Sequence, residues 1–75
     1  MEYVMFDRIT IKKSICDGKP CIRGMRFPVY QIIDLVAAGN SFDEILNDFP
    51  YLEEEDIRQS LEYAAYLTRE EWIAV

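Results

Sequence analysis

The chain has 75 residues, of which 51% are hydrophobic, and it carries a net charge of −6. This length supports one small domain, residues 1–75, because a second hydrophobic core has no room, and the apolar fraction argues against disorder. No apolar run approaches the roughly 20 residues of a membrane span, and the acidic start does not resemble a signal peptide, so we expect a cytoplasmic protein.

Charge divides the chain into two parts of opposite sign. Residues 1–30 contain six basic and three acidic side chains, whereas residues 31–75 contain two basic and eleven acidic ones. This separation of charge predicts two surfaces that bind different classes of partner. The basic part can meet nucleic acid or an acidic protein, and the acidic part can meet a basic protein or simply keep the chain soluble.

The first 28 residues are predicted to form a β arm. Residues 8–12 alternate polar and apolar side chains, which is the period of a half-buried strand. Asp17-Gly18 is a turn signal. Beyond it, residues 21–23 and 26–28 are expected to pair as a hairpin with Gly24-Met25 at its tip, because glycine readily takes the positive φ that the turn requires.

Residues 29–71 are predicted to form a core of three short amphipathic helices, and residues 72–75 a C-terminal tail. In the first helix, apolar side chains recur at the helical period from Val29 to Val36. Gly39 then supplies a left-handed stop.

The second and third helices have clear start signals. Ser41, with Glu44 three residues on, forms a capping box for the second helix, and Pro50 ends it. The third helix is expected to start near Glu53 or Glu54 and to run to about Glu71. Its predicted buried stripe consists of Ile57, Leu61, Ala64 and Ala65. The order of elements predicts a mainly α fold, a tri-helical helix-turn-helix core with a small N-terminal β strand or hairpin.

In a helix-turn-helix domain the third helix reads DNA, but here residues 53–56 place four acidic side chains in its first turn. Because carboxylates repel phosphates, we interpret this run as a solvated acidic cap and prefer the basic β arm as the DNA surface. A structural role stays open for Lys19 and Arg23, with Arg23 hydrogen bonding to loop carbonyls or to an acidic helix end. The candidate DNA-binding residues are Lys12, Lys13, Lys19, Arg23, Arg26, Arg58 and Gln59.

The C-terminal stretch is predicted to bind a protein partner. Tyrosine and tryptophan are frequent interface anchors, and acids near them can meet basic residues of a partner. An apolar tail either docks onto a partner or packs on its own domain or dimer mate, and both alternatives stay open. The candidate partner-binding residues are Tyr63, Tyr66, Glu70, Trp72 and Ile73.

The sequence predicts a binding protein rather than an enzyme, without catalytic, cofactor-binding or metal-binding residues. It contains no histidine, the commonest general base, and its three glycines are dispersed instead of forming a phosphate loop. Cys16 and Cys21 cannot complete a four-ligand zinc site in one chain. A metal shared across a dimer and a disulfide are weaker alternatives to two small, half-buried thiols.

Several segments resemble the family known as domain of unknown function 433, and together they cover about residues 7–66. They are Arg8-Ile-Thr-Ile11, the stretch from Ile15 to Val29 that contains Gly18-Lys-Pro-Cys-Ile-Arg-Gly24, Ser41-Phe-Asp-Glu-Ile-Leu46, Phe49-Pro-Tyr-Leu52 and Asp56-Ile57. Met25 stands where the family usually has threonine. Glu53 stands where it usually has a serine or threonine cap, which weakens a DNA-reading role for the third helix.

This resemblance implies a homeodomain-like fold with a small β element, and an antitoxin that pairs with a small nuclease-like toxin. We therefore predict a homodimeric, antitoxin-like binding protein that neutralises a cognate nuclease-like toxin, and we leave open that it also binds operator DNA and regulates its own operon. The alternatives are a DNA-binding transcriptional regulator without a toxin partner and a structural or assembly adaptor.

Overall fold

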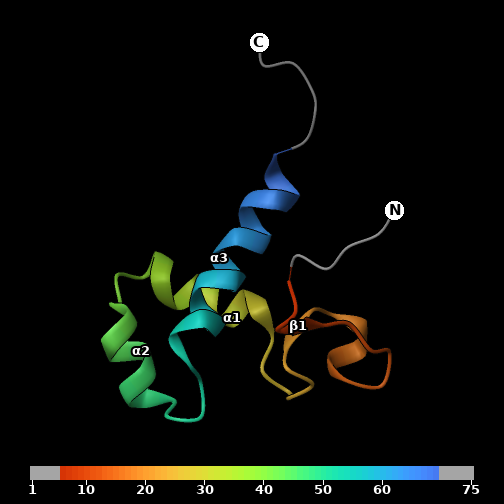
Figure 1. Ribbon diagram of the computed structural model, residues 1–75, viewed down its shortest axis with the longest axis horizontal. Coiled ribbons are helices and arrows are strands. Elements are labelled where there is room, and N and C mark those ends of the chain that lie inside the picture. Colours follow the sequence, from red (N-terminus) through yellow and green to blue (C-terminus); the bar gives the residue numbers. More distant parts are fainter. Residues whose placement is uncertain (1–5, 70–75) are drawn as a thin grey trace.

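The computed structural model describes residues 6–69, which form three helices and a small antiparallel sheet (Figure 1). This confirms the predicted mainly α fold with a small N-terminal β element. In chain order the elements are β1 (Ile9–Thr10), the 3-10 turn η1 (Cys16–Gly18), β2 (Cys21–Ile22), α1 (Val29–Ala37), α2 (Phe42–Asp48) and α3 (Glu54–Thr68).

The β arm contains more pairing than the sequence predicted. β1 lies antiparallel to β2, with Ile9 opposite Ile22, and the backbone N–H of Arg23 donates to the carbonyl of Arg8 at 2.8 Å. The predicted hairpin is also present, since Cys21 forms a bridge with Pro28. The segment that begins at β2 therefore has a neighbour on each side.

The turn of the hairpin lies one residue earlier than expected. Its central residues are Arg23 and Gly24, with φ angles of 43° and 73°, and the N–H of Met25 donates to the carbonyl of Ile22 at 2.7 Å. The prediction of Gly24-Met25 at the tip was wrong because a turn of this type needs a positive φ at both central positions. A positive φ is unfavourable for arginine, and the hydrogen bonds of its side chain to Asp56 and to the Tyr51 carbonyl offset this cost.

The helix boundaries follow the local signals. Ser41 Oγ accepts from the N–H of Glu44 at 3.1 Å, and the Glu44 carboxylate accepts from the N–H of Ser41 at 2.8 Å, so the predicted capping box of α2 is confirmed. At the start of α3, the N–H of Glu53 donates to the carboxylate of Asp56 at 2.8 Å. α3 ends at Thr68, three residues before the predicted end at Glu71.

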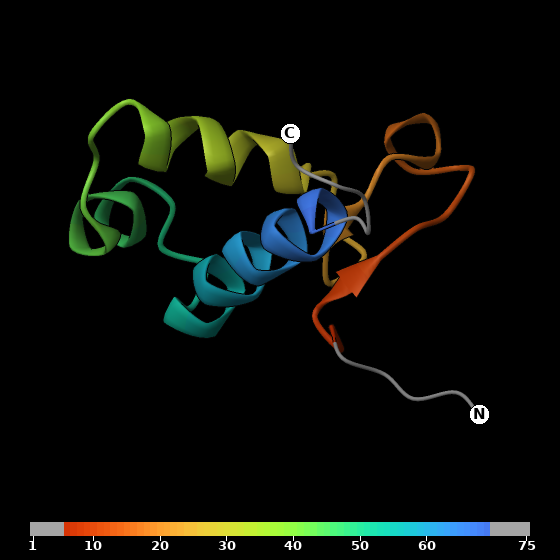
Figure 2. The ribbon, with the colours of Figure 1, turned by 90° about the horizontal axis from the view of Figure 1, so that it is seen from above.

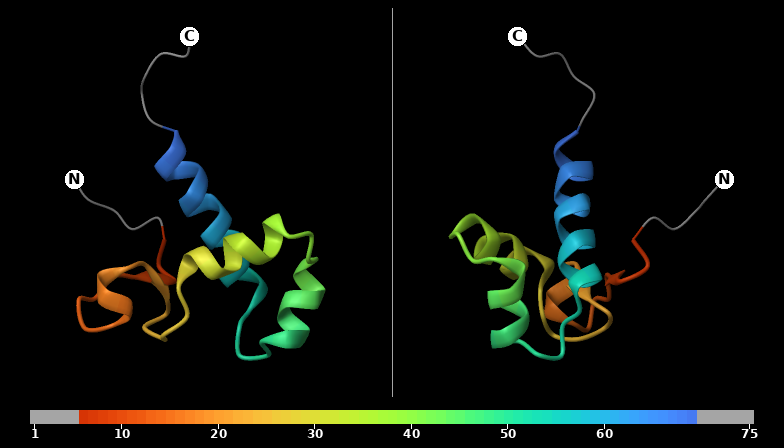
Figure 3. Two further views of the ribbon diagram at one scale, coloured as in Figure 1. Left: turned by 180° about the vertical axis from the view of Figure 1, so that it is seen from behind. Right: turned by 60° about the vertical axis from the view of Figure 1, so that its left-hand side comes forward.

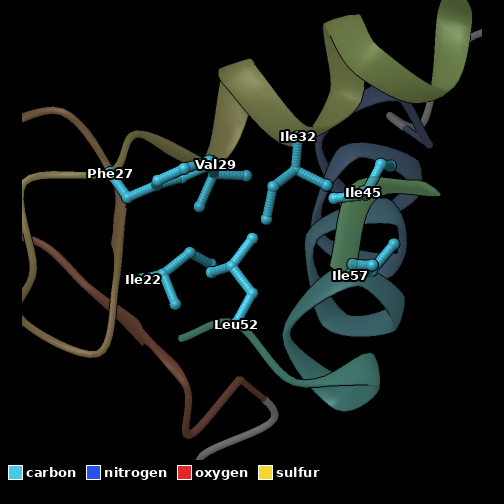
Figure 4. Packing of buried hydrophobic residues seen from close by; sticks show 7 residues of the cluster. All are labelled: Ile22, Phe27, Val29, Ile32, Ile45, Leu52 and Ile57. Atoms are coloured by element: carbon cyan, nitrogen blue, oxygen red, sulfur yellow. The ribbon is translucent and has the colours of Figure 1, made fainter. Parts of the chain in front are cut away.

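Seven buried apolar side chains from the β arm, the helices and the loops that join them form the core (Figure 4). α3 packs against both α1 and α2. Each fully buried aliphatic side chain stabilises the fold by about 1.5–3 kcal/mol relative to an exposed one. The core residues are Ile22, Phe27, Val29, Ile32, Ile45, Leu52 and Ile57.

The two ends of α3 have different surroundings. Ile57, near its start, is fully buried, but Ala65 is exposed and Leu67 is 52% exposed. The predicted buried stripe was therefore wrong at Ala65, because the C-terminal half of α3 projects beyond α1 and the β arm (Figure 3). Seen from above, α2 and the β arm lie at opposite ends of the molecule (Figure 2).

Candidate functional site

Four of the predicted DNA-binding cations lie on the surface of the β arm. Their side chains are exposed, and the ion pairs among residues 6–69 are made by other arginines, Arg8, Arg23 and Arg58. The arm that contains them forms one end of the molecule (Figure 2). The four are Lys12, Lys13, Lys19 and Arg26.

Arg23, in contrast, binds the protein itself. Its Nη2 donates to the carbonyl of Tyr51 at 2.9 Å and to Asp56 Oδ2 at 2.8 Å, while its Nε donates to Asp56 Oδ1 at 3.1 Å. A bidentate arginine–carboxylate pair of this kind is both strong and directional. The structural alternative for Arg23, a loop carbonyl and an acidic helix start, is thus confirmed.

Asp56 is the centre of this network, and its side chain is 0% exposed. Each of its carboxylate oxygens accepts two hydrogen bonds. Oδ1 accepts from Arg8 and Arg23, and Oδ2 accepts from Arg23 and from the N–H of Glu53. Burial alone would raise the pKa of Asp56, but the bonds from Arg23, Glu53 and Arg8 outweigh it and hold the pKa below its ordinary value. The interpretation of residues 53–56 as a solvated cap was wrong at Asp56.

Gln59 joins the start of the described chain to α3. Its Oε1 accepts from the backbone N–H of Arg8 at 3.1 Å, and its Nε2 donates to Asp7 Oδ1 at 2.8 Å. The side chain is 7% exposed. Most of the hydrogen-bonding capacity of this amide, which the sequence assigned to DNA, is therefore used inside the protein.

Arg58 lies on the outer surface of α3 between two acids. It pairs with Glu55 at 2.8 Å and with Glu62 at 2.7 Å, and its own side chain is 52% exposed. Exposed ion pairs along a helix contribute little to stability because solvent screens them, so Arg58 can exchange these partners for another anion.

The two described candidates for partner binding, Tyr63 and Tyr66, flank Phe6. The Phe6 ring centroid lies 5.3 Å from that of Tyr63, nearly perpendicular to it, and 5.7 Å from that of Tyr66. Tyr63 is half-buried, whereas Tyr66 is 52% exposed. The other three candidates, Glu70, Trp72 and Ile73, lie outside the described residues.

An apolar groove of about 280 Å³ runs between α1 and the C-terminal half of α3, and we call it the α1–α3 groove. Two of its walls expose large side chains, since Tyr30 is 54% and Leu67 is 52% accessible. A contiguous exposed apolar surface on so small a domain is typical of an interaction site. The groove is lined by Lys19, Pro20, Val29, Tyr30, Ile33, Tyr63, Ala64, Leu67 and Thr68.

Neither cysteine is engaged in a disulfide, and Cys21 is buried while Cys16 is half-buried. Burial, followed by the neighbouring Cys16, raises the pKa of the Cys21 thiol to about 11. Cys21 is therefore protonated at neutral pH, whereas a nucleophile or a metal ligand needs the thiolate. Among residues 6–69, no cluster of three or more histidine, cysteine or acidic side chains is placed to hold a metal ion.

Sequence reasoning missed Arg8 and Asp56 as partners. One signal was present, because Asp56 stands three residues after the cap Glu53, where an acid can accept the N–H of the cap residue. The two arginines come from distant parts of the chain, 48 and 33 residues before Asp56. No local pattern connects residues at such separations, so only the fold brings them together.

Within residues 6–69, no helix combines the length and the apolar character that a membrane crossing requires. A family model described as "Protein of unknown function (DUF433)" matches residues 9–64. The match runs from β1 into the second half of α3, so it includes Asp56 and its partners Arg23 and Glu53 but not Arg8.

The relatives have no stated activity. An uncharacterized protein of Sinorhizobium fredii is 41% identical over 56 residues, which are 75% of this chain and 25% of that protein, so the chain spans about a quarter of this curated relative. The crystal structure of a DUF433 member protein from Anabaena variabilis is similar with a TM-score of 0.73 and 27% identity, covering 83% of this chain and 60% of that chain.

Proposed function

Because this chain belongs to the DUF433 family, whose description states no activity, we propose a function from its own surface: it is an antitoxin-like protein that neutralises a cognate nuclease-like toxin by direct binding. The observation that carries this proposal is the α1–α3 groove. Its apolar walls and the exposed Tyr30 and Leu67 suit a protein partner better than the charged backbone of a nucleic acid.

The shape of the groove favours a partner that inserts a few apolar side chains. Amphipathic segments commonly bind proteins by laying one apolar face into a groove between helices. Tyrosine is among the residue types that most often dominate the binding energy of an interface. Tyr30 and Tyr63, on opposite walls, are therefore the expected contacts of such a segment.

Charge supports a nuclease-like partner. The helical part of the chain, residues 29–68, contains nine acidic side chains and one basic one, Arg58. A nuclease needs basic side chains to hold the phosphates of its substrate. The exposed acids among these nine are complementary in charge to such a protein, and complementarity of this kind speeds association and favours the correct partner.

The proposal is tested by co-purification of this chain with the product of the adjacent reading frame, together with a growth assay of that product. We expect a stable complex, toxicity of the product alone and rescue of growth by this chain. A product that neither binds this chain nor slows growth would overturn the antitoxin function.

Two tyrosines allow a matched test of the groove. Tyr30 and Tyr51 are both 54% exposed, but only Tyr30 lines the α1–α3 groove. We expect Tyr30→Ser to weaken toxin binding about tenfold or more and Tyr51→Ser to leave the affinity within about twofold, as measured by titration calorimetry. Equal losses from the two variants would place the interface elsewhere.

Binding of operator DNA is the second candidate function, and the exposed cations of the β arm favour it. If Lys12 and Lys13 contact phosphates, replacing both with glutamine should reduce the slope of log affinity against log salt by about 1.8, since each contact contributes about 0.9. Arg58→Gln on α3 is the matched control and should leave the slope unchanged. A lower slope for Arg58→Gln and an unchanged slope for the lysine variant would place the DNA contact on α3. Binding without any salt dependence would exclude phosphate contacts at both surfaces.

A further inference from the structure

We propose that the C-terminal segment of this chain, residues 70–75, docks into the α1–α3 groove of the same molecule, with Trp72 as its anchor. The inference does not rest on the proposed function, because it concerns the chain without a partner. Of the two alternatives that the sequence left open for the apolar tail, it favours packing on the tail's own domain, and it assigns the α1–α3 groove as the site.

The groove ends where the segment begins. Leu67 and Thr68, the last residues of α3, already line it, and at Arg69 the backbone has left the helical conformation, with φ −93° and ψ 46°. The segment therefore starts at the rim of the groove. It does not need to cross another element to enter it.

The segment is long enough to reach the middle of the groove. Going back along α3 from Thr68 to Tyr63 covers about 8 Å, at 1.5 Å per helical residue. The three residues from Arg69 to Trp72 span up to about 10 Å when extended. A chain that reverses at Arg69 can thus place the Trp72 side chain beside Tyr63 and Ala64.

The chemistry of the segment matches that of the groove. Trp72, Ile73 and Val75 are apolar, and an indole is large enough to fill much of an apolar hollow of about 280 Å³. Lys19 stands at the rim, exposed and without an ion pair among the described residues. Glu70 and Glu71, which precede Trp72, are complementary to it in charge.

Docking of residues 70–75 covers the groove. Covering it in the isolated chain removes from water an apolar surface that would otherwise favour nonspecific association.

Trp72 reports directly on this docking because it is the only tryptophan of the chain. In the full-length protein we expect a blue-shifted emission maximum and weak quenching by acrylamide, both independent of protein concentration. Ala64→Glu, which places a charge on the wall of the groove, should shift the emission to the red and increase quenching. Ala65→Glu, the same change at the next position, which does not line the groove, should not.

Other outcomes would overturn the proposal. Solvent-like emission of the unmodified chain would mean that the tail is not docked. A blue shift that disappears on dilution would assign the groove to a second copy, and one that Ala64→Glu leaves unchanged would place Trp72 elsewhere. Circular dichroism checks that each variant is folded. If Ala64→Glu does not fold, Leu67→Ser repeats the test at a groove position that is already 52% exposed.

Discussion

At the scale of single residues, Asp56 joins the β arm to α3. Arg8 precedes β1 and Arg23 forms the hairpin turn, and both donate to this one fully buried carboxylate. A buried ion pair adds little compared with an apolar replacement of the same shape, but removal of one partner leaves an uncompensated charge. The network therefore makes Asp56 the most sensitive polar position of the described chain.

Replacing Asp56 with asparagine tests this. Asparagine keeps the size of the side chain and an acceptor for the N–H of Glu53, but it removes the charge that Arg8 and Arg23 share. We expect the free energy of unfolding to fall by about 2–4 kcal/mol, below the upper end for buried pairs because both arginines are partly exposed. Glu54→Gln replaces an exposed acid in the same first turn of α3. It should change the free energy of unfolding by at most about 1 kcal/mol in a urea titration.

Acid should weaken the same network. Because the folded-state pKa of Asp56 is lowered, its contribution to stability is fully present above the pKa of the unfolded chain, about 3.9, and is lost as the pH falls through the folded-state value. The difference in unfolding free energy between the unmodified chain and Asp56→Asn should therefore stay constant from pH 7 to about 5 and shrink below about 4. A difference that persists unchanged at pH 3 would contradict the assignment.

At the scale of elements, the short sheet and the short helix α2 are too small to be stable alone and depend on contacts beyond their own backbone hydrogen bonds. β1 and β2 contain two residues each, and a two-stranded ribbon of this size is not stable alone in water. The arm is ordered because Ile22 and Phe27 enter the core and because Arg8 and Arg23 bind Asp56. α2, with seven residues, relies instead on its cap and on the burial of Ile45.

The capping box of α2 gives a prediction at this scale. Ser41→Ala removes the acceptor of the Glu44 N–H and should lower the free energy of unfolding by about 1 kcal/mol, whereas Ser41→Asp, which keeps an acceptor, should preserve most of it. Thermal unfolding followed by circular dichroism compares the two variants. Equal losses would indicate that the side chain of residue 41 is not what stabilises the start of the helix.

At the scale of the whole molecule, stability is concentrated where α3 crosses the core. The first half of this helix contains the fully buried Ile57 and Ser60, whereas the second half projects beyond its neighbours (Figure 3). Local opening requires less free energy where few apolar contacts are broken. The projecting half also carries the α1–α3 groove, so the part of the helix that is free to bind is the part least held by the core.

Amide hydrogen exchange should reveal this gradient. We expect the amides of residues 58–61 to exchange only through global unfolding and those of residues 66–68 to exchange through local fraying, several orders of magnitude faster for a fold stable by about 5 kcal/mol. Uniform protection along α3 would show that the second half of the helix is held as firmly as the first.

The sequence by itself determined the class of fold, the order of the elements, the capping box of α2 and the burial of Val29 and Ile57 within their helices. These follow from spacing within one helix or strand, where side chains three or four residues apart must share a face. The family membership could also be predicted, since the segments that resemble the family, such as Gly18 to Gly24, are short runs of consecutive residues.

Only the tertiary structure decided which charges are free. Arg23, Arg58 and Gln59 looked equivalent to the lysines of the β arm as contacts for DNA, yet Arg23 and Gln59 bind within the fold and the lysines do not. It also placed the start of α1 near one side of the second half of α3 and so created the groove. Both outcomes depend on residues far apart in the chain, whose distances are set by the packing of whole elements rather than by any local period.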